Sequence, residues 1–300
     1  AKDHVIEDLL KLSRHENIEL AGMCAMVVAT AIGDDACLQA LFGPAERRAE
    51  LLDAMVHWLG EMKRSNNYDL PSAGALAAAN IVRSDENSRI VAGIPGLLEA
   101  LIAMANTDRM GFQHNALGAL KNLTRLPENK TRCLELGLLQ GISAGLNSST
   151  GPIQYRAATL LRALCLPPGA AEIVAQVAAM DGLVARLVHL GRQEDEHVRA
   201  EATRALCNFV RNGGSAAISQ QIVDAGAVAN MVTLLNSRFP MLQNEVLVTM
   251  VLLMSAVPAA GALMREAGAV ERAQAIHDET PVPEVRGNAA SLLTALGNQP

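Results

Sequence analysis

The sequence contains few aromatic residues: Phe, Trp and Tyr make up 2% of its 300 residues, although half of the chain is hydrophobic. Its apolar residues are mostly Ala, Leu, Val, Ile and Met, which suit closely packed helices. All-β folds are richer in aromatic and β-branched residues. This composition therefore predicts an all-α protein.

The sequence also lacks an excess of basic residues. Lys and Arg number 25 against 31 Asp and Glu, so the formal net charge is −6. Nucleic-acid-binding domains carry a basic face, and the composition argues against such a partner. An acidic chain is compatible with a basic protein partner.

Membrane and secretion signals are absent from the sequence. The longest apolar run, residues 246–257, falls well short of the ~20 residues of a membrane span. No secretory signal opens the chain, and without an initiator Met it is expected to be a fragment of a longer protein. The cysteines are odd in number and form no C-x-x-C pair, which predicts buried free thiols in the cytosol: Cys24, Cys37, Cys133, Cys165 and Cys207.

What the chain does contain is an internal repeat. Residues 75–83 (ALAAANIVR) recur as 117–125 (LGALKNLTR) and 203–211 (TRALCNFVR), each an apolar helix ending in Asn-x-x-Arg. The first two copies are 42 residues apart, and the third follows after two steps of 43. A period of roughly 40–47 residues is typical of armadillo and HEAT arrays.

The repeat predicts one armadillo-repeat solenoid over residues 1–300, a right-handed superhelix of α-helices with about six to seven repeats. Its expected boundaries are a truncated first repeat 1–33, a longer repeat 34–84, and then 85–126, 127–166, 167–211, 212–257 and 258–300. Residues 1–14 should form one helix. The long third helices of the repeats are expected at 17–31, 70–84, 112–126, 153–166, 197–211, 241–256 and 284–296.

Several positions fix the register of these repeats. The first turns of five third helices align at Gln113, Gln154, Arg199, Gln243 and Arg286. Glycine is expected to join the first and second helices at Gly137, Gly182, Gly226 and Gly268, because it tolerates the left-handed conformation. The surplus of the longer repeat is expected in loops near residues 42–44 and 65–68.

The sequence contains no convincing catalytic, metal-binding or phosphate-binding motif. Residues 141–145 match G-x-S-x-G, but the motif needs a strand before it, and here it lies in a predicted helix. The histidines lack metal-ligand spacing, and no phosphate-binding glycine loop occurs. We therefore expect a non-enzymatic protein without cofactor or metal.

The Asn-x-x-Arg positions are the candidate binding residues: Asn80, Arg83, Asn122, Arg125, Asn208 and Arg211. An amide at the end of a helix can bond local backbone, or present its donor and acceptor to a segment in the groove. Each arginine lies near the same face, where it can hold a carboxylate or pair with an acidic residue of another repeat. Both alternatives stay open from sequence alone.

Three stretches, residues 65–85, 113–123 and 241–248, resemble the SmgGDS family, the Smg GDP dissociation stimulators. Their order and spacing also agree, and the resemblance is to the C-terminal half of the family's solenoid. It implies an armadillo protein that binds small GTPases of the Rho, Rap and Ras type, favouring those with a polybasic, prenylated tail. Members promote GDP release and chaperone their partners.

The resemblance also implies a site. Asn80 and Asn122 match asparagines that contact the GTPase, and Gln113 and Asn244 lie in matching stretches. Glu16 and Glu19 are the nearest candidates for an acidic patch that receives the basic tail. For a prenyl pocket, the small residues of one helix either leave apolar space or simply pack closely: Ala73, Gly74, Ala77 and Ala78.

Exchange of this kind requires no catalytic acid or base, because tighter binding of the nucleotide-free GTPase is sufficient. The alternative is a generic armadillo adaptor that binds a peptide or a disordered segment of another protein. Import receptors pair groove asparagines with regularly spaced tryptophans, whereas this chain has Trp58 alone. A myosin chaperone of the UCS type is a further relative with such repeats.

Overall fold

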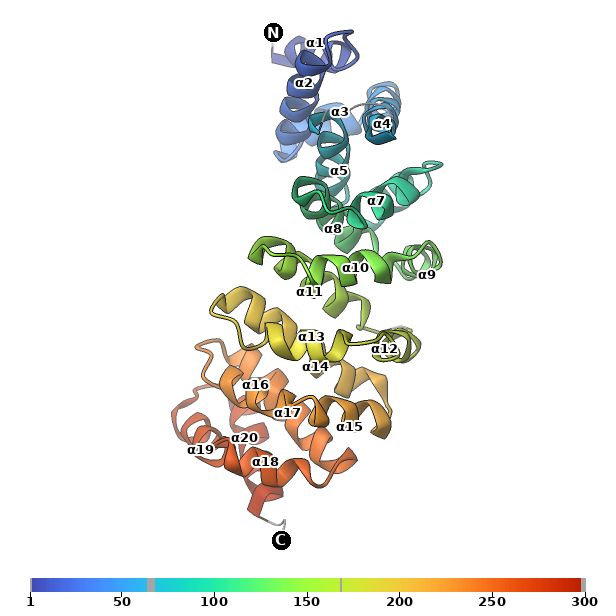
Figure 1. Ribbon diagram of the computed structural model, residues 1–300. Coiled ribbons are helices and arrows are strands. Elements are labelled where there is room, and N and C mark those ends of the chain that lie inside the picture. The colour runs from blue at the N-terminus through green and yellow to red at the C-terminus, as the bar shows by residue number, and fades with distance from the viewer. Residues whose placement is uncertain (1, 64–67, 168, 298–300) are drawn as a thin grey trace. The chain divides into compact units, whose positions relative to one another are not determined.

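The computed structural model describes residues 2–63, 68–167 and 169–297. Within these residues the protein has twenty α-helices, one short 3-10 helix and no strand, which confirms the predicted all-α class. The chain divides into two compact units, Ala1–Leu160 (unit 1) and Leu161–Pro300 (unit 2). In each unit, helices follow one another in stacked triplets (Figure 1).

Unit 1 begins with a helix pair, α1 (Lys2–Leu12) and α2 (Ile18–Ala31). Helix triplets then follow, in which the third helix of one triplet packs on that of the next: α2 on α5 and α5 on α8. Their bounds are α3 (Asp35–Phe42), α4 (Ala45–Gly60) and α5 (Asp69–Ile81); α6 (Asp85–Ala92), α7 (Leu97–Ala105) and α8 (Met110–Leu123); α9 (Pro127–Glu135), α10 (Leu138–Leu146) and α11 (Gly151–Leu164). The 3-10 helix η1 (Glu61–Lys63) follows α4.

Unit 2 takes up the end of α11 and continues the same order, with α14 packed on α17 and α17 on α20. The helix bounds are α12 (Ala170–Ala178), α13 (Leu183–Leu190) and α14 (Glu196–Gly213); α15 (Ala216–Asp224), α16 (Ala227–Leu234) and α17 (Pro240–Ala256); α18 (Ala260–Glu266), α19 (Ala269–Glu279) and α20 (Pro283–Gly297). All the predicted third helices are present, within a few residues of their expected ends.

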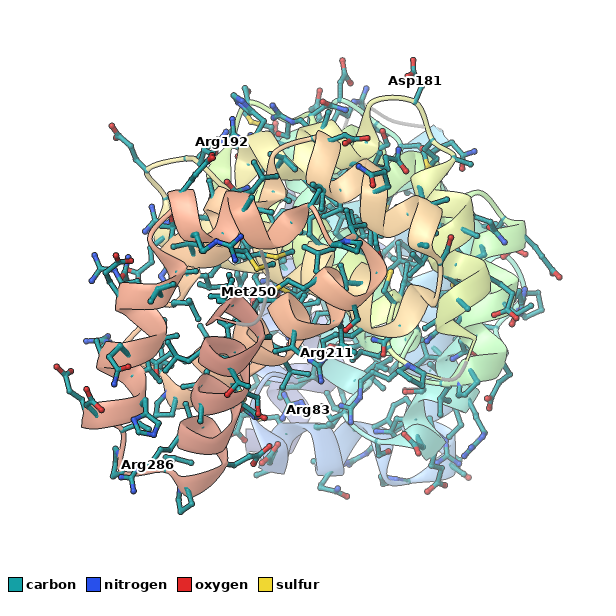
Figure 2. All side chains as sticks on the ribbon, turned by 90° about the horizontal axis from the view of Figure 1, so that it is seen from below. Arg83, Asp181, Arg192, Arg211, Met250 and Arg286 are labelled. Carbon is teal, nitrogen blue, oxygen red and sulfur yellow. The ribbon has the colours of Figure 1, made fainter. Side chains whose placement is uncertain are left out.

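Short polar caps and glycines set the helix boundaries. Asn17 accepts bonds from the backbone N–H groups of Glu19 and Leu20 and so begins α2. Gly226 and Gly268 join first to second helices with φ of 82° and 85°, a conformation that a side chain would strain. The equivalent turn after α12 projects Asp181 outward (Figure 2). These turns confirm the register predicted from the glycines.

Close packing of small residues holds the third helices of unit 1 together. Ala73, Ala77 and Ala78 on α5 are fully buried. A Cβ on Gly74 would lie 2.7 Å from Cγ of Leu59 on α4. Of the two alternatives for these residues, the structure shows close packing, since α4 fills the space beside α5.

The remaining sequence motifs fall in ordinary places. Residues 141–145, the G-x-S-x-G match, lie inside helix α10. Gly43 and Pro44 form the predicted break between α3 and α4, while residues 65–67 of the second expected loop lie outside the described residues. Among the described residues no single helix is long and apolar enough to span a membrane; three bent helix pairs meet that test by length and composition.

Four of the cysteines are buried free thiols, as predicted, and Cys37 is half-buried. Burial raises the pKa of the Cys133 and Cys207 thiols to about 12. Because the thiolate is the reactive form, these two cysteines are inert in the folded chain.

Candidate functional site

The candidate residues all lie on the third helices or at their ends. We call the solvent-facing side of these helices the third-helix face and describe it separately for each unit. In unit 1 it is formed by α2, α5, α8 and the first part of α11; in unit 2 by the end of α11, α14, α17 and α20.

The repeated asparagines connect neighbouring third helices. The side-chain amide Nδ2 of Asn80 donates to the Ala29 carbonyl (2.9 Å), and that of Asn122 donates to Ala79 (3.1 Å). Both carbonyls belong to the last turn of the preceding third helix, where no intrahelical donor is available. The amide donor therefore serves the structure through the preceding repeat rather than through local backbone. Both side chains are half-buried, and Oδ1 of each accepts no bond from the described residues.

Asn208 makes the same bond but has no surface to offer. Its Nδ2 donates to the Arg162 carbonyl at 3.1 Å. The residue is 1% exposed, and its Oδ1 is buried without a partner among the described residues. The prediction that Asn208 contacts a partner protein is therefore wrong for this conformation, because packing encloses the amide.

The three arginines of the motif differ in their partners. Arg83 donates to the carbonyls of Ile32 (3.2 Å) and Gly33 and pairs with Asp35, so it caps the end of α2. Arg211 lies 3.7 Å from the carboxylate of Glu245. These two follow the alternative of pairing across repeats. Arg125 is exposed, and no described residue bonds to it.

The prediction that Gln113 is a surface contact needs correction. This residue is 4% exposed, and its Nε2 donates to the carbonyl of Ala105 at the end of α7 (3.4 Å), so it is not a surface contact. The aligned first-turn residues share this task, since each donates to a carbonyl of the loop before its own helix: Gln154 to Ser148, Arg199 to Gln193, Gln243 to Ser237 and Arg286 to Thr280. The alignment of these positions gave the right register, whereas the role as a partner contact, which the resemblance implied for Gln113, does not fit its burial.

Asn244 is engaged within unit 2. Its Nδ2 donates to the carboxylate of Glu284 (2.9 Å), and its Oδ1 accepts from Nδ2 of Asn288 (2.7 Å). It is half-buried, with both ends of its amide in use. A partner would have to displace these bonds in order to reach it.

A ladder of alternating charges occupies the third-helix face of unit 2. Arg162 on α11 bonds to Glu201 on α14 (2.7 Å). Glu201 also bonds to Arg204 (2.7 Å), which in turn bonds to Glu245 on α17 (2.6 Å). With Arg211 at its end, this ion ladder joins three helices and pairs three arginines with two glutamates.

Burial and charge act against each other in the ladder. The Glu201 side chain is 10% exposed, and burial by itself would raise its pKa. The guanidinium groups of Arg162 and Arg204 outweigh burial and lower the pKa of Glu201 below its usual value. In the same way, the carboxylates raise the pKa of Arg204 despite its burial.

The third-helix face of unit 1 carries cations without such a ladder. Lys121 lies in the last turn of α8 and Arg125 lies just beyond the end of that helix at Leu123; no described residue forms an ion pair with either. Arg156 on α11 crosses α8, with a guanidinium nitrogen 3.4 Å from Nε2 of His114. A Cβ on Gly118 would lie 3.3 Å from the same guanidinium. Burial, and then Arg156, lower the pKa of His114, which keeps that ring neutral near pH 7.

Sequence reasoning missed Arg156, Glu201 and Glu245, although a signal was present. The column two residues after the aligned first-turn position reads Asn115, Arg156, Glu201, Glu245 and Asn288. The two units thus differ at this column, which contributes two carboxylates and an amide in unit 2 but an amide and a guanidinium in unit 1. A comparison of repeats position by position would have found it.

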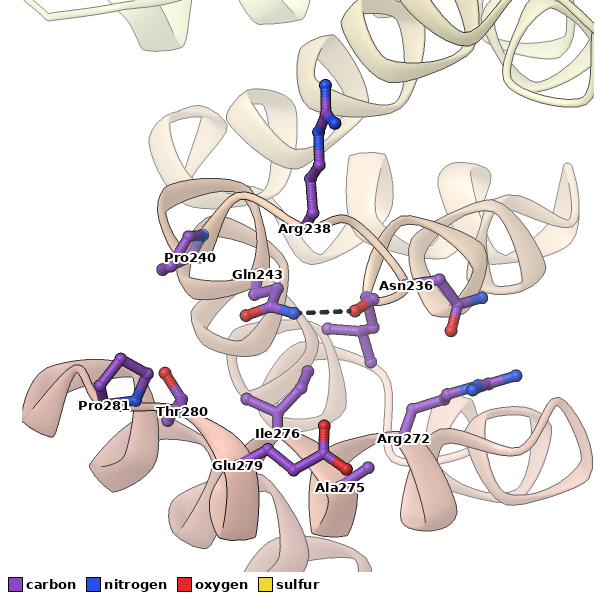
Figure 3. Close-up of a pocket in the computed structure, with 11 residues that line it drawn as sticks. Asn236, Arg238, Pro240, Gln243, Arg272, Ala275, Ile276, Glu279, Thr280 and Pro281 are labelled. Atoms are coloured by element: carbon purple, nitrogen blue, oxygen red, sulfur yellow. Dashed lines mark hydrogen bonds between the residues drawn. The ribbon is translucent and has the colours of Figure 1, made fainter.

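Two pockets lie away from these residues. In unit 2 a polar pocket of about 340 Å³ is lined by Arg238, Arg272 and Glu279, among others. Gln243 borders it while donating to the Leu235 carbonyl (Figure 3). In unit 1 an apolar pocket of about 380 Å³ lies between α4 and α7, and its lining includes Val56, Leu59, Met62, Leu97, Ala100 and Ala103.

No protein-family model matches the chain. Over 99% of its length it is 30% identical to Rap1 GTPase-GDP dissociation stimulator 1-A of Xenopus laevis and 28% identical to the 1-B form. Over 90% it is 24% identical to the GTPase-GDP dissociation stimulator vimar of Drosophila melanogaster. The resemblance to the SmgGDS family is confirmed. The chain spans 49%, 49% and 45% of these SmgGDS relatives, about half of their length.

Solved structures agree on the fold. An engineered protein matches 98% of the chain and 69% of its own length, with a TM-score of 0.76 and 25% identity. A designed armadillo repeat protein matches 82% of the chain and 99% of its own length, with a TM-score of 0.69 and 20% identity. This likeness shows the armadillo fold and leaves the function to other observations.

Proposed function

We propose that this chain binds small GTPases on the third-helix face of unit 1 and promotes release of their GDP. The similarity to Rap1 GTPase-GDP dissociation stimulators along 99% of the chain carries the proposal. The residues of the face suit a binding role without catalysis. Asn80 and Asn122 offer free amide oxygens to backbone N–H groups, and Arg125 offers an unpaired guanidinium.

The mechanism needs binding energy alone. If the face contacts the nucleotide-free GTPase more strongly than the GDP-bound form, binding shifts the equilibrium toward release. The chain would then act at stoichiometric amounts in the cytosol and hold the GTPase until another nucleotide enters. The alternative of a peptide adaptor is supported by the designed peptide-binding armadillo neighbours at the level of the fold.

Release of a fluorescent GDP analogue from Rap-type and Rho-type GTPases tests the proposal. Faster release by this chain is expected. Arg125→Ala should reduce it, because the Arg125 guanidinium is unbonded within the described fold and is available to contact the GTPase. Arg272→Ala is the matched control, an exposed arginine in unit 2. Unchanged release with no complex formation would overturn the proposal in favour of the adaptor.

We propose further that a prenyl chain on the GTPase tail enters the apolar pocket between α4 and α7. Its volume lies within the range of small-ligand sites, and its lining is mainly aliphatic. Ala100→Trp should fill the pocket and abolish binding of a fluorescent farnesyl-cysteine, whereas GDP release from an unprenylated GTPase should persist. Normal probe binding to the Ala100→Trp variant would place the lipid elsewhere.

A further inference from the structure

The third-helix face of unit 1 presents a row of cations that no carboxylate of the described residues neutralises. We define the basic row as Lys121 in the last turn of α8, Arg125 just beyond that helix, and Arg156 on α11. None of the three forms an ion pair with a described residue. The preceding repeat shows what neutralisation would look like, because Arg83 pairs with Asp35 at the start of α3. Asp85 stands at the same place at the start of α6 but does not pair with Arg125.

An aromatic cluster lies at the other end of the same helix. The Tyr68 ring is 5.6 Å from that of Phe112, and the Arg109 guanidinium lies 4.8 Å from the Tyr68 ring. Tyr68 is 53% exposed, and Met110, the residue after Arg109, is 55% exposed. Tyr, Met and Arg are enriched at protein interfaces. An apolar anchor and the basic row thus lie at opposite ends of α8, which is about 20 Å long at 1.5 Å per residue.

From this arrangement we infer that the face takes an acidic, extended segment of a partner protein. An apolar side chain of the segment would contact Tyr68 and Met110, and its carboxylates would pair with the basic row. The free Oδ1 atoms of Asn80 and Asn122 would accept its backbone N–H groups. The inference deepens the proposed function, and it rests on that function only for the assignment of this segment to the GTPase.

The charges favour this occupant over a lysine-rich tail. Cations at Lys121, Arg125 and Arg156 repel a basic segment and attract carboxylates. A protein segment is favoured over nucleic acid because the chain is acidic overall and the face carries exposed apolar side chains. Bidentate pairing to a carboxylate suits the two arginines in particular.

Fluorescence anisotropy with two labelled peptides tests the inference on the full chain. One peptide alternates glutamate with leucine and tyrosine, and the other has lysine at every glutamate position. The acidic peptide should bind, the lysine peptide should not, and added salt should weaken binding. The double variant Lys121→Glu, Arg125→Glu should bind the acidic peptide about tenfold more weakly or worse.

A matched control distinguishes binding at the basic row from a general effect of net charge on peptide binding. Arg238→Glu, Arg272→Glu makes the same change in charge at exposed positions of unit 2, and it should leave acidic-peptide binding unchanged. Equal loss in both double variants, or preference for the lysine peptide, would overturn the inference. Preference for a single-stranded oligonucleotide of equal charge would overturn it as well.

The same variants distinguish this inference from the proposed function. Peptide binding without any effect on GDP release would retain the acidic-segment surface and remove the GTPase as its partner. GDP release that survives Lys121→Glu, Arg125→Glu unchanged would retain the proposed function and reject this surface as its contact.

Discussion

The two units contain similar helices and the same small excess of acidic over basic residues, yet their third-helix faces differ in how charge is arranged. In unit 2, Glu201 and Glu245 lie between arginines, and the ion pairs of the ladder join neighbouring helices. In unit 1, Lys121 and Arg125 remain unpaired among the described residues. Composition therefore does not identify a binding face; pairing does, because a neutralised cation has little left for a partner.

Substitution of Glu201 should have the largest effect on the difference in stability between the two units. Glu201→Gln should leave Arg162 without its carboxylate partner, and Arg204 with Glu245 as its remaining one, in a region that is mostly buried. Removing one partner from a buried ion pair costs about 3 kcal/mol or more. Because stability in repeat proteins is local, the loss should appear in unit 2 first. Cys207 and Cys133 report the two units, since each thiol is buried and reacts only after opening.

Labelling by iodoacetamide under native conditions measures this opening. The Glu201→Gln variant should label faster than the unaltered chain at Cys207 and at the same rate at Cys133. Equal acceleration at both cysteines would mean that the two units open together. The exposed substitution Glu271→Gln in unit 2 serves as the control and should change neither rate.

The same carboxylate predicts a response to acid. The folded-state pKa of Glu201 is lowered, so its ion pairs contribute stability above the usual value of about 4.5, and that stability is lost as pH falls toward the lowered value. Amide hydrogen exchange, corrected for its intrinsic rate at each pH, should therefore rise in unit 2 below about pH 4.5, more than it does in unit 1. In Glu201→Gln this additional rise should disappear, while a response that persists would assign it to other carboxylates.

Substitutions at the two ends of the Asn-x-x-Arg motif in unit 1 should differ in their effect on stability, because one residue supports the fold and the other is available for binding. Asn122→Ala leaves the Ala79 carbonyl without its donor and should lower the free energy of unfolding by about 1 kcal/mol. Arg125→Ala should change it by less than about 0.5 kcal/mol, because the side chain is exposed and unbonded within the described residues. Urea denaturation followed by circular dichroism measures both. Similar losses in the two variants would contradict the assignment of Arg125 as free.

Sequence alone predicted the helices better than the contacts of their side chains. The period and the glycines gave the third helices and the turns, because helix length and left-handed backbone leave local signals, as at Gly226. The role of Asn80 depends on a carbonyl 51 residues earlier, and that of Gln113 on a carbonyl at the end of α7. Local patterns carry no information about which carbonyl lies opposite.

The predicted binding residues show the same limit. Asn208 and Asn122 occupy equivalent positions in their repeats, but one is buried and the other is half-buried. That difference arises from the surrounding packing, which the motif does not encode. The SmgGDS resemblance contributed the family and a class of partner, whereas the contrast between the ion ladder and the basic row required the three-dimensional arrangement.

A transplanted carboxylate should make unit 1 resemble unit 2. Asn115 occupies the position that holds Glu201 and Glu245 in unit 2, and it lies one turn from the Gly118 position that Arg156 crosses. Asn115→Glu should place a carboxylate near Arg156 and weaken binding of the acidic peptide about threefold, the scale of one exposed ion pair. Asn115→Gln keeps the side-chain size and should bind normally. An unchanged affinity in Asn115→Glu would show that Arg156 contributes little to the surface.

The smallest expected effect concerns His114. Burial and the neighbouring Arg156 both lower its pKa, burial more strongly. Arg156→Gln should therefore raise the His114 pKa part of the way toward its usual value of about 6.5, and NMR titration of the imidazole measures the change. Because the folded-state pKa is depressed, protonation favours unfolding, and stability falls as pH drops through about 6.5. Arg156→Gln should reduce that loss, whereas an unchanged His114 pKa would mean that the guanidinium stays clear of the ring and is more exposed to a partner than the 3.4 Å contact indicates.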